Sequence, residues 1–313
     1  MTDQVVVTGA SGWVGGHVCR VLHRLGWDVV GVSRTPDRAR AAHPSWRWIG
    51  VGDELESAVT EAGRVINLAG RNVFEQPWTP EFVAAMRASR VGTTARVVDA
   101  LGRTRVANPV LVSASGFLVC GDGGEAPLDD DRPASRELVL GDVYTDWEAT
   151  ARAAEGPARV AILRLGVVLG PDHGAFPQLR APFDAGQGVV LGSGWQWVPW
   201  VHLVDAVGLL VEALTDPRYR GVVNAVAPQP ARHDDVARAL GEALGVPWQS
   251  WVPDDQVVAS LGGAAELLVH SHRLVPRRAL EIGFEFAHPD IAGAVKDLVA
   301  AAPPHTEEKS WTD

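Results

Sequence analysis

A chain of 313 residues, 46% of them hydrophobic, is long enough for one or two domains with a large core. Its net charge of −10, with no basic run, argues against a nucleic-acid partner, and no apolar run reaches the length of a membrane span. The two cysteines, Cys19 and Cys120, show neither metal-ligand spacing nor a disulfide framework, and no leader precedes the first apolar segment, so we expect a protein of the reducing cytoplasm.

The first predicted element is a buried strand over residues 5–8, followed by a glycine-rich turn and a helical apolar pattern. Gly9 permits a sharp turn, Gly12 lets a pyrophosphate approach the backbone, and Gly15 lets the helix pack on the strand. The start of the helix offers free N–H groups to phosphates. The pattern therefore predicts a dinucleotide site, whose contacts we place at Thr8, Gly9, Ser11, Gly12, Trp13, Val14 and Gly15.

The second predicted strand, residues 27–34, indicates which dinucleotide is bound. An acid at the end of this strand holds the ribose 2′-hydroxyl of NAD, whereas an arginine accommodates a 2′-phosphate. Ser33 and Arg34 occupy this place, and Arg38 follows. This favours NADP(H) over NAD(H), unless the arginines only form a solvated helix face.

Further strands alternate with helices as far as residue 169. Strands are expected at 46–51, 65–70, 110–115 and Arg159–Leu165, with helices at Pro80–Leu101 and about 146–155. This alternation predicts an α/β protein with a doubly wound parallel sheet. Small or apolar residues at the strand ends extend the predicted cofactor site: Leu68, Ala69, Gly70, Ser113 and Leu165.

The pattern loosens after residue 169, where glycine and proline become frequent. We expect a nucleotide-binding domain over residues 1–169, its sheet completed by strands near 198–226, and mainly a smaller substrate lobe over 170–302. Tryptophans at 195, 197 and 200 suggest an apolar or aromatic substrate, or only packing between lobes. The polar segment 303–313 is expected to be a disordered tail.

Motifs along nearly the whole chain resemble those of one family. They are Thr8-Gly9-Ala10-Ser11-Gly12-Trp13-Val14-Gly15, Asn67-Leu68-Ala69-Gly70, Ser89-Arg90-Val91-Gly92-Thr93-Thr94, Ser113-Ala114-Ser115, Trp147-Glu148, Leu163-Arg164-Leu165-Gly166, Trp200-Val201-His202-Leu203-Val204-Asp205 and Pro276-Arg277-Arg278-Ala279-Leu280. They are similar to those of atypical extended short-chain dehydrogenases/reductases, in the nucleoside-diphosphate-sugar epimerase-like branch called "epimerase family protein". The resemblance implies a Rossmann domain with a small C-terminal substrate lobe and linkage to NADP(H).

This chain differs from the resembled family at the catalytic residues. A working short-chain dehydrogenase uses a serine and a Tyr-x-x-x-Lys pair, whose lysine favours the phenolate and holds the nicotinamide ribose. Ser115 and Tyr144 match the serine and the tyrosine, but Glu148 stands in the lysine slot, as it tends to in this branch. Relatives usually carry Tyr-Tyr-Gly where this chain has Val119-Cys120-Gly121. Ordinary ketone–alcohol redox is therefore in doubt.

Other residues offer alternative acid–base groups. Tyr144 and Glu148 are four apart, so they form either an acid–base pair on one helix face or part of an acid-rich surface turn. His202 is either a general acid or base or a structural histidine between lobes. Arg164 is expected in an ion pair, Cys120 as a buried small residue, and Asp205 as a helix cap.

Three hypotheses for the function remain. The first is an NADP(H)-dependent oxidoreductase or epimerase-like enzyme acting on a small organic substrate through Ser115 and Tyr144. The second is a non-redox cyclase, dehydratase or isomerase of a natural-product pathway that uses Tyr144, Glu148 or His202. The third is a non-catalytic NADPH-binding protein. No metal, nucleic acid or membrane partner is expected, and the chain is expected to be a monomer or homodimer.

Overall fold

A parallel seven-stranded sheet forms the centre of the computed structural model, which describes residues 3–302. Its strands are β1 (Gln4–Thr8), β2 (Asp28–Val32), β3 (Arg47–Ile49), β4 (Arg64–Asn67), β5 (Val110–Gly116), β6 (Arg159–Leu165) and β11 (Gly221–Ala225). They lie in the order β11-β6-β5-β4-β1-β2-β3, and every neighbouring pair is parallel. The strand order reverses beside β1, so the predicted doubly wound sheet is confirmed.

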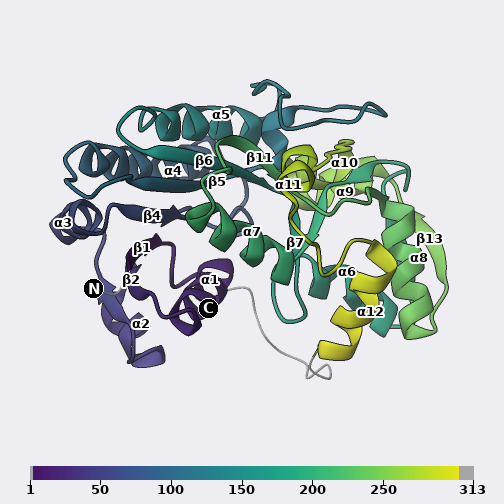
Figure 1. The fold of residues 1–313 in the computed structure, drawn as a ribbon. Helices are drawn as coiled ribbons and strands as arrows, with labels where there is room; N and C mark the ends of the chain where they lie inside the picture. The colour runs from purple at the N-terminus through teal and green to yellow at the C-terminus, as the bar shows by residue number, and fades with distance from the viewer. Residues whose placement is uncertain (1–2, 303–313) are drawn as a thin grey trace.

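Helices cover both faces of this sheet (Figure 1). One face carries α3 (Asp53–Ala62), α4 (Pro80–Leu101) and α5 (Val139–Arg152); the other carries α1 (Trp13–Arg24), α2 (Pro36–Ala42), α7 (Leu203–Thr215) and α11 (Arg277–Ile282). Side chains of β1 alternate between these layers. Val5 and Val7 pack with α1 and α7, whereas Val6 packs with α3 and α4. Both faces are apolar because both are covered.

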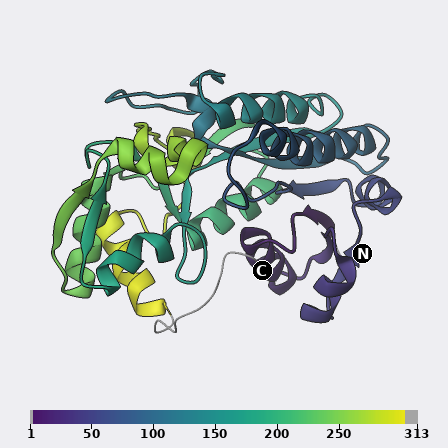
Figure 2. The same cartoon turned by 180° about the vertical axis from the view of Figure 1, so that it is seen from behind.

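A second lobe lies at one end of the sheet, as Figures 1 and 2 show from opposite sides. Its strands pair in twos: β7 (Val167–Leu169) with β10 (Trp200–His202), β8 (Gly188–Leu191) with β13 (Trp248–Val252), and β9 (Trp197–Val198) with β12 (Ala231–Arg232). Its helices are α6 (Phe176–Asp184), α8 (His233–Leu244), α9 (Asp254–Leu261), α10 (Glu266–Val269) and α12 (Ile291–Ala301), with a short 3-10 turn at Gly262–Ala265. Another 3-10 turn, Phe117–Cys120, directly follows β5 of the central sheet. Phe176, Trp200 and Leu240 belong to its separate core.

Two expectations from the sequence change in detail. β11 completes the central sheet, whereas β10 pairs with β7 outside it. Helix α5 begins at Val139 rather than near residue 146, which places Tyr144 and Glu148 within the helix. The expected disordered tail, 303–313, lies outside the described residues. Across residues 3–302, no helix combines the length and apolarity needed to cross a membrane.

Candidate functional site

The glycine turn between β1 and α1 has the geometry that a dinucleotide phosphate requires. Gly9 has a φ of +68°, and a Cβ there would lie 2.6 Å from the carbonyl oxygen of Leu68. A Cβ on Gly15 would lie 2.2 Å from the Gly9 oxygen, so α1 packs directly on the turn. The helix begins after Gly12 with no side-chain cap and no acid in its first turn. Its first N–H groups are therefore suited to donate hydrogen bonds to phosphate oxygens.

Thr8 joins this turn to the loop that follows β4. Its hydroxyl donates to the Asn67 side-chain oxygen over 2.7 Å and accepts from the backbone N–H groups of Leu68 and Ala69 at 3.1 and 3.2 Å. Asn67 in turn donates to the hydroxyls of Thr94 and Ser113. Thr8 and Ser113 are fully buried, so they support the two loops from beneath. The loop from Leu68 to Gly70 remains the surface above them on which a cofactor can lie.

The end of β2 carries a positive charge and no acid. Buried Ser33 donates its hydroxyl to Ser11 over 3.1 Å and accepts from the Thr35 N–H, which fixes the turn after β2. Arg34 and Arg38 are exposed and make no hydrogen bond or ion pair within the described residues. The neighbouring acid, Asp37, pairs with Arg40 instead. Both exposed guanidinium groups therefore suit the 2′-phosphate of NADP(H).

Replacing Arg34 with alanine is expected to weaken NADPH binding roughly tenfold or more while changing NADH binding little, because only NADPH carries the 2′-phosphate. Isothermal titration of both nucleotides against wild-type and variant protein measures this. Arg40→Ala is the matched control, since Arg40 is already paired with Asp37. Equal losses for the two nucleotides would place the 2′-phosphate elsewhere.

Glu148 lies in a buried ion pair. Its carboxylate accepts from Arg164 Nε at 2.8 Å and Nη2 at 3.0 Å, and it also accepts the Ser115 hydroxyl at 2.8 Å. The Glu148 and Arg164 side chains are only 3% and 2% exposed. The bidentate arginine neutralises the carboxylate, so the expected ion pair of Arg164 is confirmed and its partner is the residue in the lysine slot.

Tyr144 lies beside this pair rather than on the surface. Its ring packs against the end of β5, where a Cβ on Gly116 would be 2.5 Å from ring atom Cε2. The side chain is buried, and its hydroxyl makes no hydrogen bond among the described residues. Ser115, Tyr144 and Glu148 therefore come together at the carboxyl end of β5, where a doubly wound sheet binds its ligand. The alternative of a solvent-facing acidic turn is wrong for Tyr144 and Glu148.

The segment that replaces Tyr-Tyr-Gly is wholly apolar and buried. Burial raises the pKa of the Cys120 thiol to about 11, against the smaller opposing effect of Arg164. Arg164 Nη1 lies 3.6 Å from the Cys120 sulfur. A thiol in this state is a packing residue rather than a nucleophile.

The tryptophans near residue 197 differ in role. Trp200 is buried in the core of the second lobe, and Trp195 is 70% exposed. Trp197 lies against the guanidinium groups of Arg232 and Arg273, 4.1 and 4.9 Å from its ring centroid. Of the three rings, only that of Trp195 offers a large exposed apolar surface.

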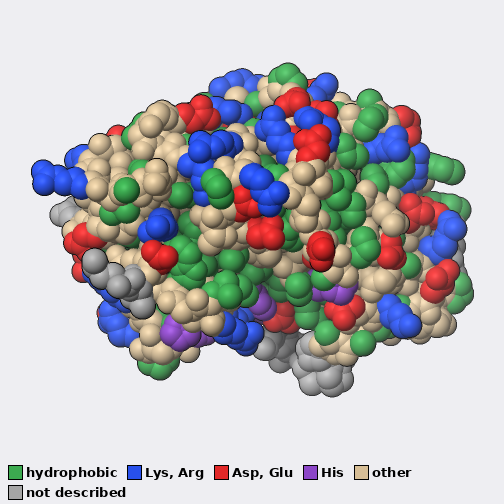
Figure 3. Space-filling model, viewed as in Figure 1, with side chains coloured by type: hydrophobic (Ala, Val, Ile, Leu, Met, Phe, Trp, Pro, Cys, Tyr) green, Lys and Arg blue, Asp and Glu red, His purple; other side chains and the backbone are tan. Residues whose placement is uncertain are grey.

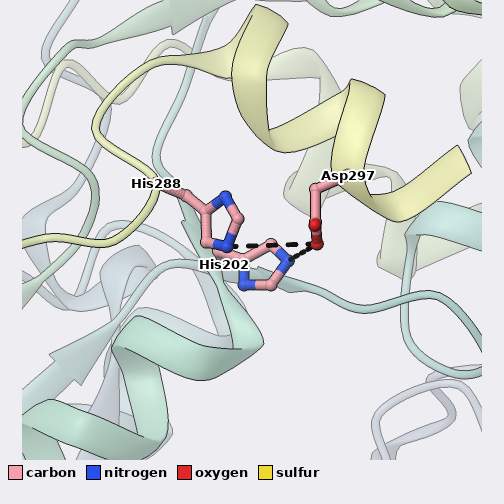
Figure 4. Close-up of side chains that lie close together, drawn as sticks. All are labelled: His202, His288 and Asp297. Carbon is pink, nitrogen blue, oxygen red and sulfur yellow. Dashed lines mark ion pairs between the residues drawn. The ribbon is translucent and has the colours of Figure 1, made fainter. Parts of the chain in front are cut away.

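His202 contacts residues of α7 and the C-terminal segment rather than Ser115 or Tyr144. Its Nδ1 accepts the Val204 N–H at 3.2 Å and so caps α7. Its ring packs on that of His288, and its Nε2 faces Asp297 of α12 at 3.5 Å (Figure 4). Asp205, expected as the cap, instead accepts the N–H groups of Ala287 and His288. These contacts join α7 to the C-terminal segment, and a role for His202 in chemistry stays a prediction.

The same cluster has the residue types of a metal site, with one ligand atom from each of His202, His288 and Asp297 within 4.8 Å of one another. Metal binding through His202 Nε2 would require a proton on Nδ1, as in sites where the second nitrogen donates outward. Nδ1 of His202, however, accepts the Val204 N–H and so carries no proton. The neutral ring therefore carries its proton on Nε2, toward Asp297, and does not suit a metal.

Three buried histidines predict a loss of stability in acid. Burial lowers the pKa of His202, His233 and His272 to about 4, and His288 contributes at His202. Below about pH 6.5 the unfolded chain binds protons at these positions that the folded protein does not bind. The free energy of unfolding is therefore expected to fall between about pH 6.5 and about pH 4, by up to about 1.4 kcal/mol per pH unit for each histidine.

Urea unfolding across this pH range measures the effect. His233→Asn is expected to reduce the slope, whereas His173→Asn, at a position whose side chain is 65% exposed, leaves it unchanged. An unfolding free energy that stays constant over this range would show that these histidines titrate normally.

Comparison with known proteins shows to which family the chain belongs. A model of the NAD dependent epimerase/dehydratase family matches residues 5–225. The chain belongs to this family. A second model, of a domain of unknown function called DUF1731, matches residues 256–298. The chain is thus an atypical extended short-chain dehydrogenase/reductase of the epimerase-like branch, as its motifs predicted.

Relatives in this family cover nearly the whole chain. The "Epimerase family protein SDR39U1 homolog, chloroplastic" of Arabidopsis thaliana is 35% identical, with 94% of this chain and 86% of that protein aligned. The crystal structure of human epimerase family protein SDR39U1 with NADPH has a TM-score of 0.86 and 30% identity, covering 95% and 99% of the two chains. UDP-glucuronic acid 4-epimerase from Bacillus cereus, with a TM-score of 0.75 and 16% identity, shares the fold.

The polar network beneath the site of this epimerase-family chain was not predicted from its sequence. Thr94 accepts hydrogen bonds from Asn67 and from the Trp147 indole, which ties α4, β4 and α5 together. Asn67 and Thr94 occur in the family motifs, but nothing in the sequence brings the two residues together. Their spacing along the chain carries no signal of contact, because they come from different elements.

Proposed function

We propose that this protein is an NADP(H)-dependent oxidoreductase or epimerase-like enzyme that acts on a small organic substrate. The observation that carries the proposal is the glycine turn at Gly9–Gly15. Ser33 hydrogen-bonds Ser11 of this turn, so the exposed Arg34 follows directly beside it. Ser115 near the end of β5 and Tyr144 of α5 supply the candidate reacting groups. Human SDR39U1, similar over nearly the whole chain, has a crystal structure with NADPH. The cofactor, when bound, would supply hydride chemistry.

Ser115 and Tyr144 are the residues nearest the proposed reacting centre. The Ser115 hydroxyl proton is given to Glu148, so its oxygen is left to accept a hydrogen bond. Such an oxygen orients a substrate hydroxyl rather than a carbonyl. The Tyr144 hydroxyl, free of partners among the described residues, is the group that can exchange a proton with substrate. Glu148, which is paired with Arg164, serves as the acceptor that orients Ser115.

Label transfer tests this proposal. Candidate carbonyl compounds are incubated with the protein and C4-deuterated NADPH, and candidate alcohols deuterated at the carbinol carbon are incubated with NADP⁺. Mass spectrometry then follows deuterium from NADPH into the alcohol product, or from the alcohol into the NADPH product. The proposal predicts deuterium in a product, lost or strongly reduced in Tyr144→Phe and in Ser115→Ala. A substrate that turns over without any exchange of label would contradict it.

The second candidate is a non-redox enzyme on the same scaffold, such as a cyclase, dehydratase or isomerase. The observation that favours it is the Glu148–Arg164 pair where a lysine would hold the nicotinamide ribose. Turnover that continues after the nucleotide has been removed would support this candidate. A third, a non-catalytic NADPH-binding protein, would show tight binding and no turnover with any compound tested.

We also propose a small-molecule substrate, a monomer or homodimer, no nucleic-acid or membrane partner, and a cytoplasmic location. Positive and negative side chains interleave over the face seen in Figure 3, which supports the absence of a nucleic-acid surface. Both cysteines are free and buried, as in a reducing compartment. The exposed Trp195 ring supports an apolar or aromatic part in the substrate.

A further inference from the structure

Arg90 is a buried arginine that has no carboxylate partner within residues 3–302. It lies on the inner face of α4 and is 7% exposed. Its Nη1 donates to the Met86 carbonyl at 3.3 Å and its Nη2 to the Arg71 carbonyl at 3.1 Å. Its Nε makes no hydrogen bond to any residue that the structure describes. Burying an arginine in this way is costly, so its charge needs an explanation in function.

The other charged side chains around Arg90 form neutral groups. Glu148 is paired with Arg164, and Arg71 with Glu75. On the outer side of α4 and α5, two arginines and two aspartates form a square of ion pairs: Arg87, Arg136, Asp142 and Asp146. Arg90 therefore gives this region of the described structure a net positive charge.

The guanidinium of Arg90 lies between the predicted cofactor loop and the predicted reacting centre. Its Cζ is 5.6 Å from the Tyr144 ring centroid and 5.4 Å from that of Trp147. On its other side it lies flat against Gly70, where a Cβ would come within 2.9 Å of Cζ. Gly70 thus has no side chain because the guanidinium occupies that space. The charge is one backbone layer beneath the surface of the Leu68–Gly70 loop.

We propose that Arg90 supplies, from α4, the fixed positive charge that a lysine on α5 supplies in other short-chain dehydrogenases. A charge at this place disfavours the oxidised nicotinamide ring, which is cationic, relative to the reduced ring, which is neutral. Arg90 therefore biases the site toward NADPH over NADP⁺. This inference rests on the proposed NADP(H) site, and it assigns the charge to a residue outside the Ser115, Tyr144 and Glu148 group.

The ratio of the dissociation constants for NADP⁺ and NADPH tests the role of Arg90 without a substrate. Energy transfer from tryptophan to bound NADPH gives the dissociation constant of NADPH. Displacement of NADPH by NADP⁺ gives the dissociation constant of NADP⁺. In Arg90→Met the ratio is expected to fall on the order of tenfold, because removing the charge favours the oxidised ring. Arg90→Lys keeps the charge and is expected to keep the ratio.

Two controls separate electrostatics from packing. A purely structural role would weaken both nucleotides equally and leave the ratio unchanged in Arg90→Met, which would overturn the inference. Arg90→Gln, neutral but able to donate hydrogen bonds, gives the same test if the methionine variant does not fold. Arg87→Met removes a half-exposed charge on the same helix and is expected to leave the ratio unchanged. If wild-type protein binds neither nucleotide, the proposed function itself fails, and this inference with it.

Discussion

Replacing Arg164 with methionine is expected to lower the free energy of unfolding by about 3–5 kcal/mol, the range found when one partner of a buried ion pair is removed. The variant leaves Glu148, 3% exposed, without its bidentate partner. It also removes the donor to the Arg132 carbonyl. Among the described residues, Ser115 is then the one that still hydrogen-bonds the carboxylate. Urea unfolding at neutral pH, followed by far-ultraviolet circular dichroism, measures the loss.

A double-mutant cycle shows whether the loss comes from the stranded carboxylate. Glu148→Leu combined with Arg164→Met removes both charges, so the double variant is expected to be more stable than Arg164→Met alone. An additive result, with the two single losses simply summed, would mean that the pair contributes no coupling. If Arg164→Met lowers the free energy of unfolding by less than about 1 kcal/mol, the pair contributes no more than an exposed salt bridge does.

Part of this centre could be predicted from the sequence. Ser115 and Tyr144 follow from their positions at the carboxyl end of β5 and in α5, and Arg164 was expected in an ion pair. The identity of its partner was not predictable, since Glu148 and Arg164 come from different elements and meet only through the packing of α5 on β6. The Ser115 hydroxyl bond to Glu148 likewise depends on that packing.

Gly15→Ala is expected to weaken NADPH binding roughly 100-fold, about 2.7 kcal/mol, and to destabilise the fold by about 1–3 kcal/mol. The new Cβ would lie 2.2 Å from the Gly9 oxygen and 2.9 Å from the Gly9 carbonyl carbon. Both are backbone atoms that cannot turn away, so α1 must move from the turn. That movement displaces the N–H groups on which phosphate binding depends. Calorimetric titration with NADPH and thermal unfolding measure the two losses.

Gly16→Ala is the matched control, one residue further along α1. A Cβ there would lie 3.7 Å from the Ala10 oxygen, which is ordinary contact. The change is expected to leave NADPH affinity intact and to raise stability by up to about 1 kcal/mol, because alanine is the better helix former. Equal affinities in the Gly15 and Gly16 variants would contradict the close packing of α1 on the turn.

The fold was largely predictable because its signals are local. β-branched runs mark the buried strands, glycines mark the turn, and the helix Pro80–Leu101 has its expected bounds. The start of α5 was placed too late because Val139–Val143 carries little polar patterning. The expectation that Asp205 caps α7 is wrong. His202 is the cap, because Asp205 instead accepts the N–H groups of segment 287–288 from the far end of the chain.

The central claim is that the turn after β1 binds NADPH, and titration of the wild-type protein tests it most directly. Energy transfer from its tryptophans to the bound nicotinamide reports occupancy without any knowledge of the substrate. We expect saturable binding of NADPH at one site per chain, with NADH binding at least tenfold weaker because Arg34 and Arg38 have no phosphate to contact. No saturable signal with NADPH, or equal binding of NADH, would contradict the account.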